Sequence, residues 1–155
     1  MENVLIVDDE KEILDLMASA VSRWGYNPIV AENGDAAVKK LEAHPIDVVI
    51  TDLRMPKKNG IELLQHIREK DDSTSVIIFT GYPALQSAID SMKSGAFDYL
   101  LKPVDLAQLK IKLDKAIKEK QARQGAKVLK NMNWALLISI PFWLILGIIL
   151  LKTLR

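Results

Sequence analysis

The chain contains no cysteine among its 155 residues, which excludes disulfide bonds, thiolate metal sites and cysteine catalysis. Histidine is scarce as well, with two residues. His44 and His66 fall in helical stretches away from the acidic clusters, and we expect them to face solvent without a chemical role. The first residues, MENVLIVDDE, lack the basic start and long apolar stretch of a signal peptide. The folded domain is therefore expected in the cytoplasm.

Acidic residues are absent from the last part of the chain. Residues 1–121 hold all 20 acidic residues and 16 of the 21 basic ones, a net charge of −4. Residues 122–155 hold five basic residues and no acid, a net charge of +5. An acidic domain repels nucleic acid phosphates, whereas a basic, apolar tail suits an anionic lipid surface. We expect membrane lipid, and no nucleic acid, among the partners.

Short apolar runs rich in β-branched residues alternate five times with amphipathic helical patterns. The runs are Val4–Val7, Pro28–Ala31, Asp47–Thr51, Val76–Thr80 and Phe97–Leu101. Five such units predict the α/β class, with a small, open, doubly wound parallel sheet covered by helices on both faces. An eight-stranded barrel would need about twice the length.

A long uncharged run breaks this alternation. Residues 134–151, WALLISIPFWLILGIILL, are 18 residues without a charge, and twelve of them are Leu, Ile or Phe. As a helix the run is about 27 Å long, close to the ~30 Å of the hydrocarbon core. A buried soluble helix is the alternative, but the five preceding units already close their own core. We predict a single transmembrane helix over residues 133–152.

These patterns divide the chain into a domain at 1–121, a basic linker or helix extension at 122–132, the transmembrane helix, and a short tail at 153–155. Basic residues are more frequent before the helix than after it, which predicts a single-pass protein of the cell (inner) membrane with its domain on the cytoplasmic side. A further basic set lies on or after the last helical pattern of the domain and is either a solvated face or a lipid headgroup contact: Lys110, Lys112, Lys115, Lys118, Lys120 and Arg123.

Acidic side chains follow two of the predicted strands. Asp8 and Asp9 come directly after the first run, and Asp52 comes after the third. If these strands are neighbours, their carboxyl ends meet at one edge of the sheet and the three carboxylates converge there. Three ionised carboxylates need a cation between them, and ligands that are all oxygen favour Mg²⁺.

Two other strand ends supply the complementary groups. Thr80 ends the fourth run, and Lys102 follows the fifth. A hydroxyl and a compact positive charge beside a metal-bound carboxylate stabilise the oxygens of a phosphoryl group. The carboxylate of Asp52 can then act as a nucleophile and form an aspartyl phosphate.

Four segments resemble the receiver domains of bacterial response regulators, over about residues 3–121: VLIVDDE, VVITDLRMPKKNGIELL, VIIFTGY and GAFDYLLKPVD. The stretch Gly95–Pro103 is especially similar to nitrogen-regulator-type members. The resemblance implies a flavodoxin-like fold with strand order 2-1-3-4-5 and a role in two-component signalling. It further implies a sensor histidine kinase or a phosphotransfer protein as partner, a possible homodimer, and switching of partner binding.

The same resemblance assigns roles to individual residues. Asp52 is the expected phosphoacceptor, and Lys102 the partner of the phosphoryl group, next to a cis peptide bond with Pro103. Thr80 and Tyr99 are the expected switch pair. The Mg²⁺ ligands implied are Asp9, Asp52 and the backbone carbonyl of Arg54, with Asp8 acting partly through water. Arg54 and Tyr82 are expected to tune the lifetime of the phosphate.

Two other functions share this architecture, but the residues of this chain argue against both. A hydrolase of the haloacid dehalogenase type needs a general acid two residues after its nucleophile, where this chain has Arg54. A flavodoxin-like cofactor carrier needs a hydroxyl- and glycine-rich loop after the first strand, where this chain has DDEKE. A membrane scaffold that works without phosphorylation, or a phosphorelay intermediate without output of its own, is the remaining alternative. We expect a phosphoacceptor that assists its own phosphorylation and dephosphorylation, and not an enzyme.

Overall fold

The structure is a computed structural model that describes residues 1–81, 84–103 and 105–126. It divides into two units, residues 1–120 and residues 121–155, which are considered separately. The predicted transmembrane helix at 133–152 lies outside the described residues, as does Tyr82. Within the described part of the chain, no helix combines the length and apolar character needed to cross a membrane.

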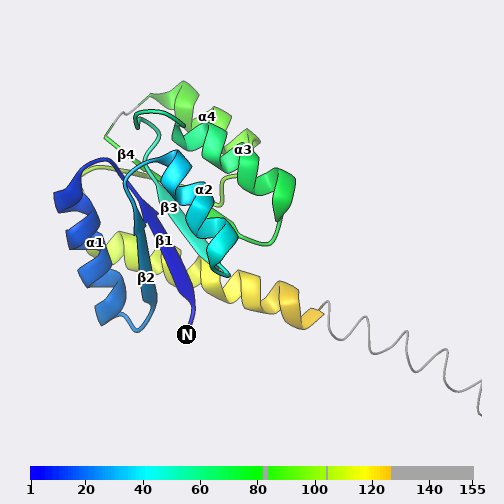
Figure 1. Cartoon of the computed structure of the whole chain (residues 1–155). Helices are drawn as coiled ribbons and strands as arrows, with labels where there is room; N and C mark the ends of the chain where they lie inside the picture. The colour runs from blue at the N-terminus through cyan, green and yellow to red at the C-terminus, as the bar shows by residue number, and fades with distance from the viewer. Residues whose placement is uncertain (82–83, 104, 127–155) are drawn as a thin grey trace, which may run out of the picture. The chain divides into compact units, whose positions relative to one another are not determined.

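Five parallel strands form a single sheet in the order β2-β1-β3-β4-β5 (Figure 1). The strands are β1 (Asn3–Val7), β2 (Asn27–Ala31), β3 (Val48–Thr51), β4 (Ser75–Thr80) and β5 (Asp98–Leu101). In the register of the two central strands, Val7 lies beside Thr51, so the residues that follow them leave the sheet at the same edge. The predicted fold class and strand order are therefore confirmed.

Helices cover both faces of the sheet. They are α1 (Lys11–Arg23), α2 (Gly34–Ala43), α3 (Gly60–Lys70) and α4 (Leu85–Lys93), and residues 106–126 are helical as well. One apolar cluster joins α1 to the helix that begins at residue 106, through buried residues such as Met17 and Leu113. A second cluster joins α2 and α3 to the opposite face, through residues such as Ala37 and Leu64. The strands are apolar on both faces because both faces are covered.

Side-chain caps fix where two helices begin. The Asn59 side chain accepts a hydrogen bond from the amide of Glu62, and the Glu62 carboxylate accepts one from the amide of Asn59, which forms a capping box at the start of α3. The Asn33 side chain caps α2 by accepting a hydrogen bond from the amide of Ala36. The capping box matters for function because α3 begins beside the edge of the sheet that carries Asp52.

Three lysines of the basic set are held by ion pairs within the domain. Lys110 pairs with Asp114 at 2.6 Å and Lys112 pairs with Asp98 at 2.7 Å. The buried Lys120 pairs with Asp47 at 2.9 Å and also donates a hydrogen bond to the carbonyl of Ile46. Burial and two contacts favour a structural role for Lys120 over contact with lipid headgroups.

The expectation that both histidines face solvent holds for His44, which is exposed, and is wrong for His66. Nε2 of His66 is buried without a hydrogen-bond partner, and the side chain lines a cavity of about 240 Å³ together with His44. The cavity lies where α2 and α3 end and β3 and β4 begin, at the edge of the sheet opposite Asp52.

Candidate functional site

The site lies at the carboxyl edge of the sheet, where four strands end. Asp8 follows β1, Asp52 follows β3, Thr80 is the last residue of β4, and Lys102 follows β5. Backbone hydrogen bonds continue past the strand ends, from the amide of Asp52 to the carbonyl of Val7 at 3.0 Å and from the amide of Lys102 to the carbonyl of Thr80 at 2.9 Å. The expected convergence of these residues on one edge is therefore present.

Three carboxylates form the acidic part of the site. Asp8, Asp9 and Asp52 each place one oxygen within 4.8 Å of those of the other two. Asp8 is 1% exposed and Asp52 is 6% exposed, whereas Asp9 is exposed to solvent. Two buried carboxylates and one open one make a site that small ions can enter from the side of Asp9.

Lys102 supplies the positive charge. Its Nζ lies 2.7 Å from Oδ2 of Asp8, 2.9 Å from Oδ2 of Asp52 and 3.1 Å from Oε1 of Glu10. The ring of Phe79 lies beneath the ammonium, with its centroid 5.6 Å from Nζ. Glu10 was not among the residues predicted from the sequence. Its place directly after Asp8 and Asp9 is the one signal in the sequence that could have indicated it. No rule of spacing pairs such a residue with a lysine 92 positions later.

Burial and ion pairing act against each other at this site. Burial raises the pKa of Asp8, and the hydrogen bond and charge of Lys102 offset this only in part. Burial alone would lower the pKa of Lys102, but the hydrogen bonds to Asp8, Asp52 and Glu10 outweigh it and raise that pKa. Lys102 therefore keeps its positive charge at neutral pH. One ammonium faces three carboxyl groups, so the negative charge of the site exceeds its positive charge.

The backbone around Asp52 holds its carboxylate in place. The amide of Arg54 donates a hydrogen bond to Oδ1 of Asp52 at 3.1 Å, and the Thr51 hydroxyl donates one to the Asp52 carbonyl at 3.0 Å. The first residue of α3, Gly60, donates its amide to the carbonyl of Leu53 at 3.1 Å. The backbone of Arg54 thus borders the carboxylate, and its carbonyl as a metal ligand stays a prediction.

The donor set fits Mg²⁺. All three side chains offer carboxylate oxygens, which is the ligand chemistry of a hard divalent cation. Oδ2 of Asp8 is buried, and the partner described for it is the ammonium of Lys102 at 2.7 Å. A buried oxygen with an incomplete set of partners, next to two further carboxylates, is suited to bind a metal directly or through water.

The expected switch residues lie beside this site. Thr80 is 1% exposed, at the end of β4. Tyr99 is partly exposed on β5, and burial together with the charge of Asp52 raises its pKa. The Lys102–Pro103 peptide bond is cis, as the resemblance implied.

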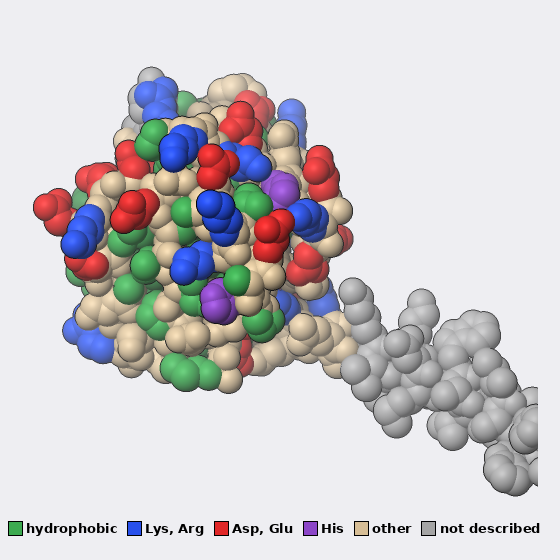
Figure 2. All heavy atoms as spheres, in the orientation of Figure 1, with side chains coloured by type: hydrophobic (Ala, Val, Ile, Leu, Met, Phe, Trp, Pro, Cys, Tyr) green, Lys and Arg blue, Asp and Glu red, His purple; other side chains and the backbone are tan. Residues whose placement is uncertain are grey.

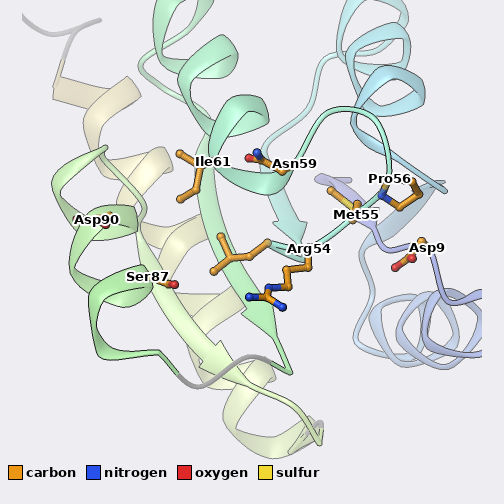
Figure 3. A pocket seen from close by; sticks show the side chains of 9 residues that line it. Asp9, Arg54, Met55, Pro56, Asn59, Ile61, Ser87 and Asp90 are labelled. Carbon is orange, nitrogen blue, oxygen red and sulfur yellow. The ribbon is translucent and has the colours of Figure 1, made fainter.

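A pocket of about 580 Å³ opens from the acidic edge toward α4. Figure 3 shows Asp9 on one side, Ser87 and Asp90 of α4 on the other, and Arg54 between them. Its lining includes Asp9 of the acidic group and Arg54, but neither Asp52 nor Lys102. Arg54 lines this pocket, and its effect on the lifetime of the phosphate stays a prediction.

Comparison with known proteins identifies the family. The family model described as "Response regulator receiver domain" matches residues 4–114. The chain therefore belongs to this family, and it is a receiver domain of the two-component type with a further segment attached. Receiver domains take phosphoryl groups from histidine kinases and bind Mg²⁺ at the acidic phosphorylation site.

Similar curated proteins are much longer than the part that matches. The transcriptional regulatory protein ZraR of Klebsiella oxytoca is 36% identical over 115 residues, which are 74% of this chain and 26% of ZraR. The regulatory protein AtoC of Escherichia coli K12 is 34% identical over 137 residues, 88% of this chain and 29% of AtoC. The DNA-binding transcriptional regulator NtrC of Proteus hauseri is 32% identical over 135 residues, 84% of this chain and 28% of NtrC. The chain thus spans about a quarter of these relatives.

Solved structures of isolated receivers match over nearly their whole length. A receiver domain protein of Clostridium thermocellum has a TM-score of 0.74 and 36% identity, covering 79% of this chain and 98% of that one. TrrA of Thermotoga maritima, solved in complex with Mg²⁺ and BeF, has a TM-score of 0.69 and 34% identity, covering 75% and 99%. A beryllofluoride-activated NtrC4 receiver dimer has a TM-score of 0.74 and 29% identity, covering 77% and 99%.

Proposed function

We propose that this chain is a membrane-anchored receiver that accepts a phosphoryl group on Asp52 in a Mg²⁺-dependent reaction and thereby switches partner binding. The observation that carries the phosphoacceptor role is the ammonium of Lys102, placed 2.9 Å from Asp52 inside a group of three metal-competent carboxylates. The complex of TrrA with Mg²⁺ and BeF supports the same role for the corresponding edge of this chain. Arg54, two residues after Asp52, is not the acid that a hydrolase would need.

In the proposed transfer, a carboxylate oxygen of Asp52 attacks the phosphorus of a phosphohistidine on a partner kinase or phosphotransfer protein. The P–N bond breaks, the P–O bond forms, and the departing imidazole takes up a proton from solvent. Lys102 pairs with the oxygens of the transferred group, and the Thr80 hydroxyl donates a hydrogen bond to one of them. Asp9, Asp52 and the backbone carbonyl of Arg54 would hold Mg²⁺, with Asp8 acting partly through water, and the ion would supply positive charge to offset that of the phosphoryl oxygens.

Labelling with a small phosphodonor tests this assignment. The full chain in detergent is incubated with acetyl phosphate and Mg²⁺, and the covalent label is expected to be lost on chelation of Mg²⁺ and to sit on Asp52 in peptide mapping. Asp52→Asn should abolish labelling, while Asp15→Asn, a change of an exposed acid on α1, should leave it intact. Labelling that persists in Asp52→Asn would refute the assignment.

The switch is proposed to act on the surface around α4 and β5. Tyr99 lines a groove of about 510 Å³ with Leu85, Ala88 and Leu101, and Leu85 is 79% exposed. When Thr80 turns to the phosphoryl group, Tyr99 can follow inward, which reshapes this apolar groove and shifts its affinity for a partner or for a second copy of the chain. The dimer of the activated NtrC4 receiver supports a homodimer as one such state.

Membrane anchoring rests on the uncharged run at 134–151 and its basic flanks. Anchoring would raise the effective concentration of the receiver toward membrane-bound kinases. The full chain is expected in the membrane fraction, and a version lacking residues 132–155 in the soluble fraction with unchanged acetyl phosphate labelling. Recovery of both versions in the soluble fraction would refute anchoring without affecting the phosphoacceptor assignment.

We propose no nucleic-acid contact for the domain, although NtrC is named as a DNA-binding regulator. The chain matches 28% of NtrC, and residues 1–121 carry a net charge of −4. Figure 2 shows acidic and basic side chains interspersed over the visible face of the domain, without a large basic patch. A gel-shift assay of the phosphorylated full chain with random duplex DNA is expected to show no retardation.

A further inference from the structure

The ammonium of Lys102 has a full set of carboxylate partners before any phosphoryl group arrives. Its Nζ contacts Asp8, Asp52 and Glu10 at 2.7, 2.9 and 3.1 Å. A lysine ammonium carries three donor hydrogens, and the centroid of the Phe79 ring lies 5.6 Å from Nζ. Modification of Asp52 converts its carboxylate to an acyl phosphate, and the more highly charged phosphoryl oxygens then compete with Asp8 and Glu10 for the same ammonium.

Glu10 is the partner that can leave at the lowest cost. The side chains of Asp8 and Asp52 are 1% and 8% exposed, whereas that of Glu10 is 58% exposed. A buried carboxylate that loses its counter-charge is destabilised strongly, while an exposed one is solvated by water. Glu10, the most exposed of the three acids, is therefore the partner that a phosphoryl oxygen displaces from Lys102.

The backbone of Glu10 is fixed while its carboxylate can move. Its amide donates a hydrogen bond to Oδ1 of Asp8 at 3.0 Å, which holds the residue at the edge of the site. Glu10 is also the N-cap residue of α1, but its side chain makes no capping hydrogen bond. The carboxylate is thus not needed to start the helix, and its described role is the contact with Lys102.

We propose that Glu10 is a positioning residue, which holds Lys102 in the unphosphorylated domain and is exchanged for a phosphoryl oxygen when Asp52 is modified. The inference rests on the proposed phosphoacceptor function. Breaking the Glu10–Lys102 pair is then part of the barrier to phosphorylation, so Glu10 slows the loading of Asp52. The contribution of one exposed ion pair corresponds to about a two- to fivefold effect.

Two variants separate the ion pair from simple charge repulsion. Glu10→Gln removes the charge, and Glu10→Asp keeps the charge but withdraws it from Lys102 by about one C–C bond length, ~1.5 Å. With the full chain in detergent and saturating Mg²⁺, both variants are expected to take up acetyl phosphate about two to five times faster than the unchanged chain. Glu12→Gln, an exposed acid in the first turn of α1, is the matched control and should not change the rate.

Two binding measurements complete the test. Beryllofluoride, followed by ¹⁹F NMR in the presence of Mg²⁺, reports the exchange without a chemical step, and both Glu10 variants should bind it about two to five times more tightly. Isothermal titration with Mg²⁺ alone should show weaker binding by Glu10→Gln, because the site has lost a negative charge, and nearly unchanged binding by Glu10→Asp.

The outcomes are distinguishable. If Glu10→Gln is faster but Glu10→Asp is not, the effect is charge repulsion and the proposed exchange is wrong. If neither variant changes the labelling rate or the affinity for beryllofluoride, while the unchanged chain is labelled on Asp52, the inference fails and the phosphoacceptor function stands. If the unchanged chain takes up no label on Asp52, both fail together.

Discussion

The first turn of α3 approaches the phosphoacceptor backbone so closely that a single methyl group should disturb it. A Cβ built on Gly60 would overlap the carbonyl oxygen of Asp52 and lie 3.0 Å from Cα of Leu53. Both obstacles are main chain, which cannot rotate away as a side-chain end can. Gly60→Ala must therefore move either the start of α3 or the end of β3.

The loss of stability expected for Gly60→Ala is the balance of two opposing effects. Overpacking of this kind costs about 1–3 kcal/mol, and alanine recovers up to about 1 kcal/mol of helix propensity relative to glycine. We expect a net loss of about 1–2 kcal/mol in the free energy of unfolding. For a domain of this size, that loss corresponds to a lower midpoint of thermal unfolding by about 4–8 °C. Because Asp52 moves as well, its labelling by acetyl phosphate should slow by about tenfold or more.

Thermal unfolding followed by circular dichroism, with labelling measured well below the midpoint, tests both effects. Gly125→Ala is the control, since a Cβ at Gly125 meets no heavy atom within 4 Å and the residue is helical. That change should leave the domain at least as stable as before and its labelling unaffected. A Gly60→Ala variant with an unchanged midpoint and unchanged labelling would refute the argument that the contact with Asp52 is tight.

Three further predictions follow from the site and its surroundings. Asp8→Asn should raise the midpoint of thermal unfolding measured without Mg²⁺, because burial disfavours the ionised Asp8 carboxyl. The same variant should lose most of the stabilisation that Mg²⁺ gives. A lower midpoint without Mg²⁺ contradicts this reasoning. Asn59→Ala removes the side chain that accepts a hydrogen bond from the amide of Glu62, and it should lower the free energy of unfolding in urea by about 1 kcal/mol. An unchanged free energy of unfolding contradicts a stabilising role for this cap. Burial, helped by a 2.8 Å hydrogen bond to Asp114, raises the pKa of Tyr26 from 10.0 to about 12. Between these pH values the unfolded chain loses the phenolic proton and the folded chain keeps it, so stability falls as pH rises, and the advantage of the unchanged chain over Tyr26→Phe should shrink from pH 9 to pH 11.

The framework of the domain was predictable because it depends on local pattern. Apolar runs that are covered on both faces must be parallel strands, and the five runs correspond to the five observed strands within about one residue at either end. Parallel strands that share an edge also bring together the residues following them. That is why the sequence alone predicts that Asp8, Asp52 and Lys102 share one site.

The partners of individual side chains were not predictable. Glu10 and Lys102 are 92 positions apart, and whether they touch depends on the length and rotamer of both side chains above the folded sheet. The same holds for Lys120, which counts as a basic residue near a membrane in the sequence but is buried against Asp47 and Ile46 in the structure. No periodicity distinguishes a solvated lysine from a buried one on the same helix.

The sequence by itself determined the fold class and the acidic edge, since these follow from hydrophobic periodicity and from residue types at strand ends. The strand order was implied by the family resemblance. Tertiary structure alone decided which carboxylates share the Lys102 ammonium, how closely Gly60 approaches Asp52, and which lysines are held inside the domain. The physical reason is range: periodicity is set by neighbours along the chain, whereas ion pairs and close approaches depend on distances of a few ångströms between segments that only folding brings together.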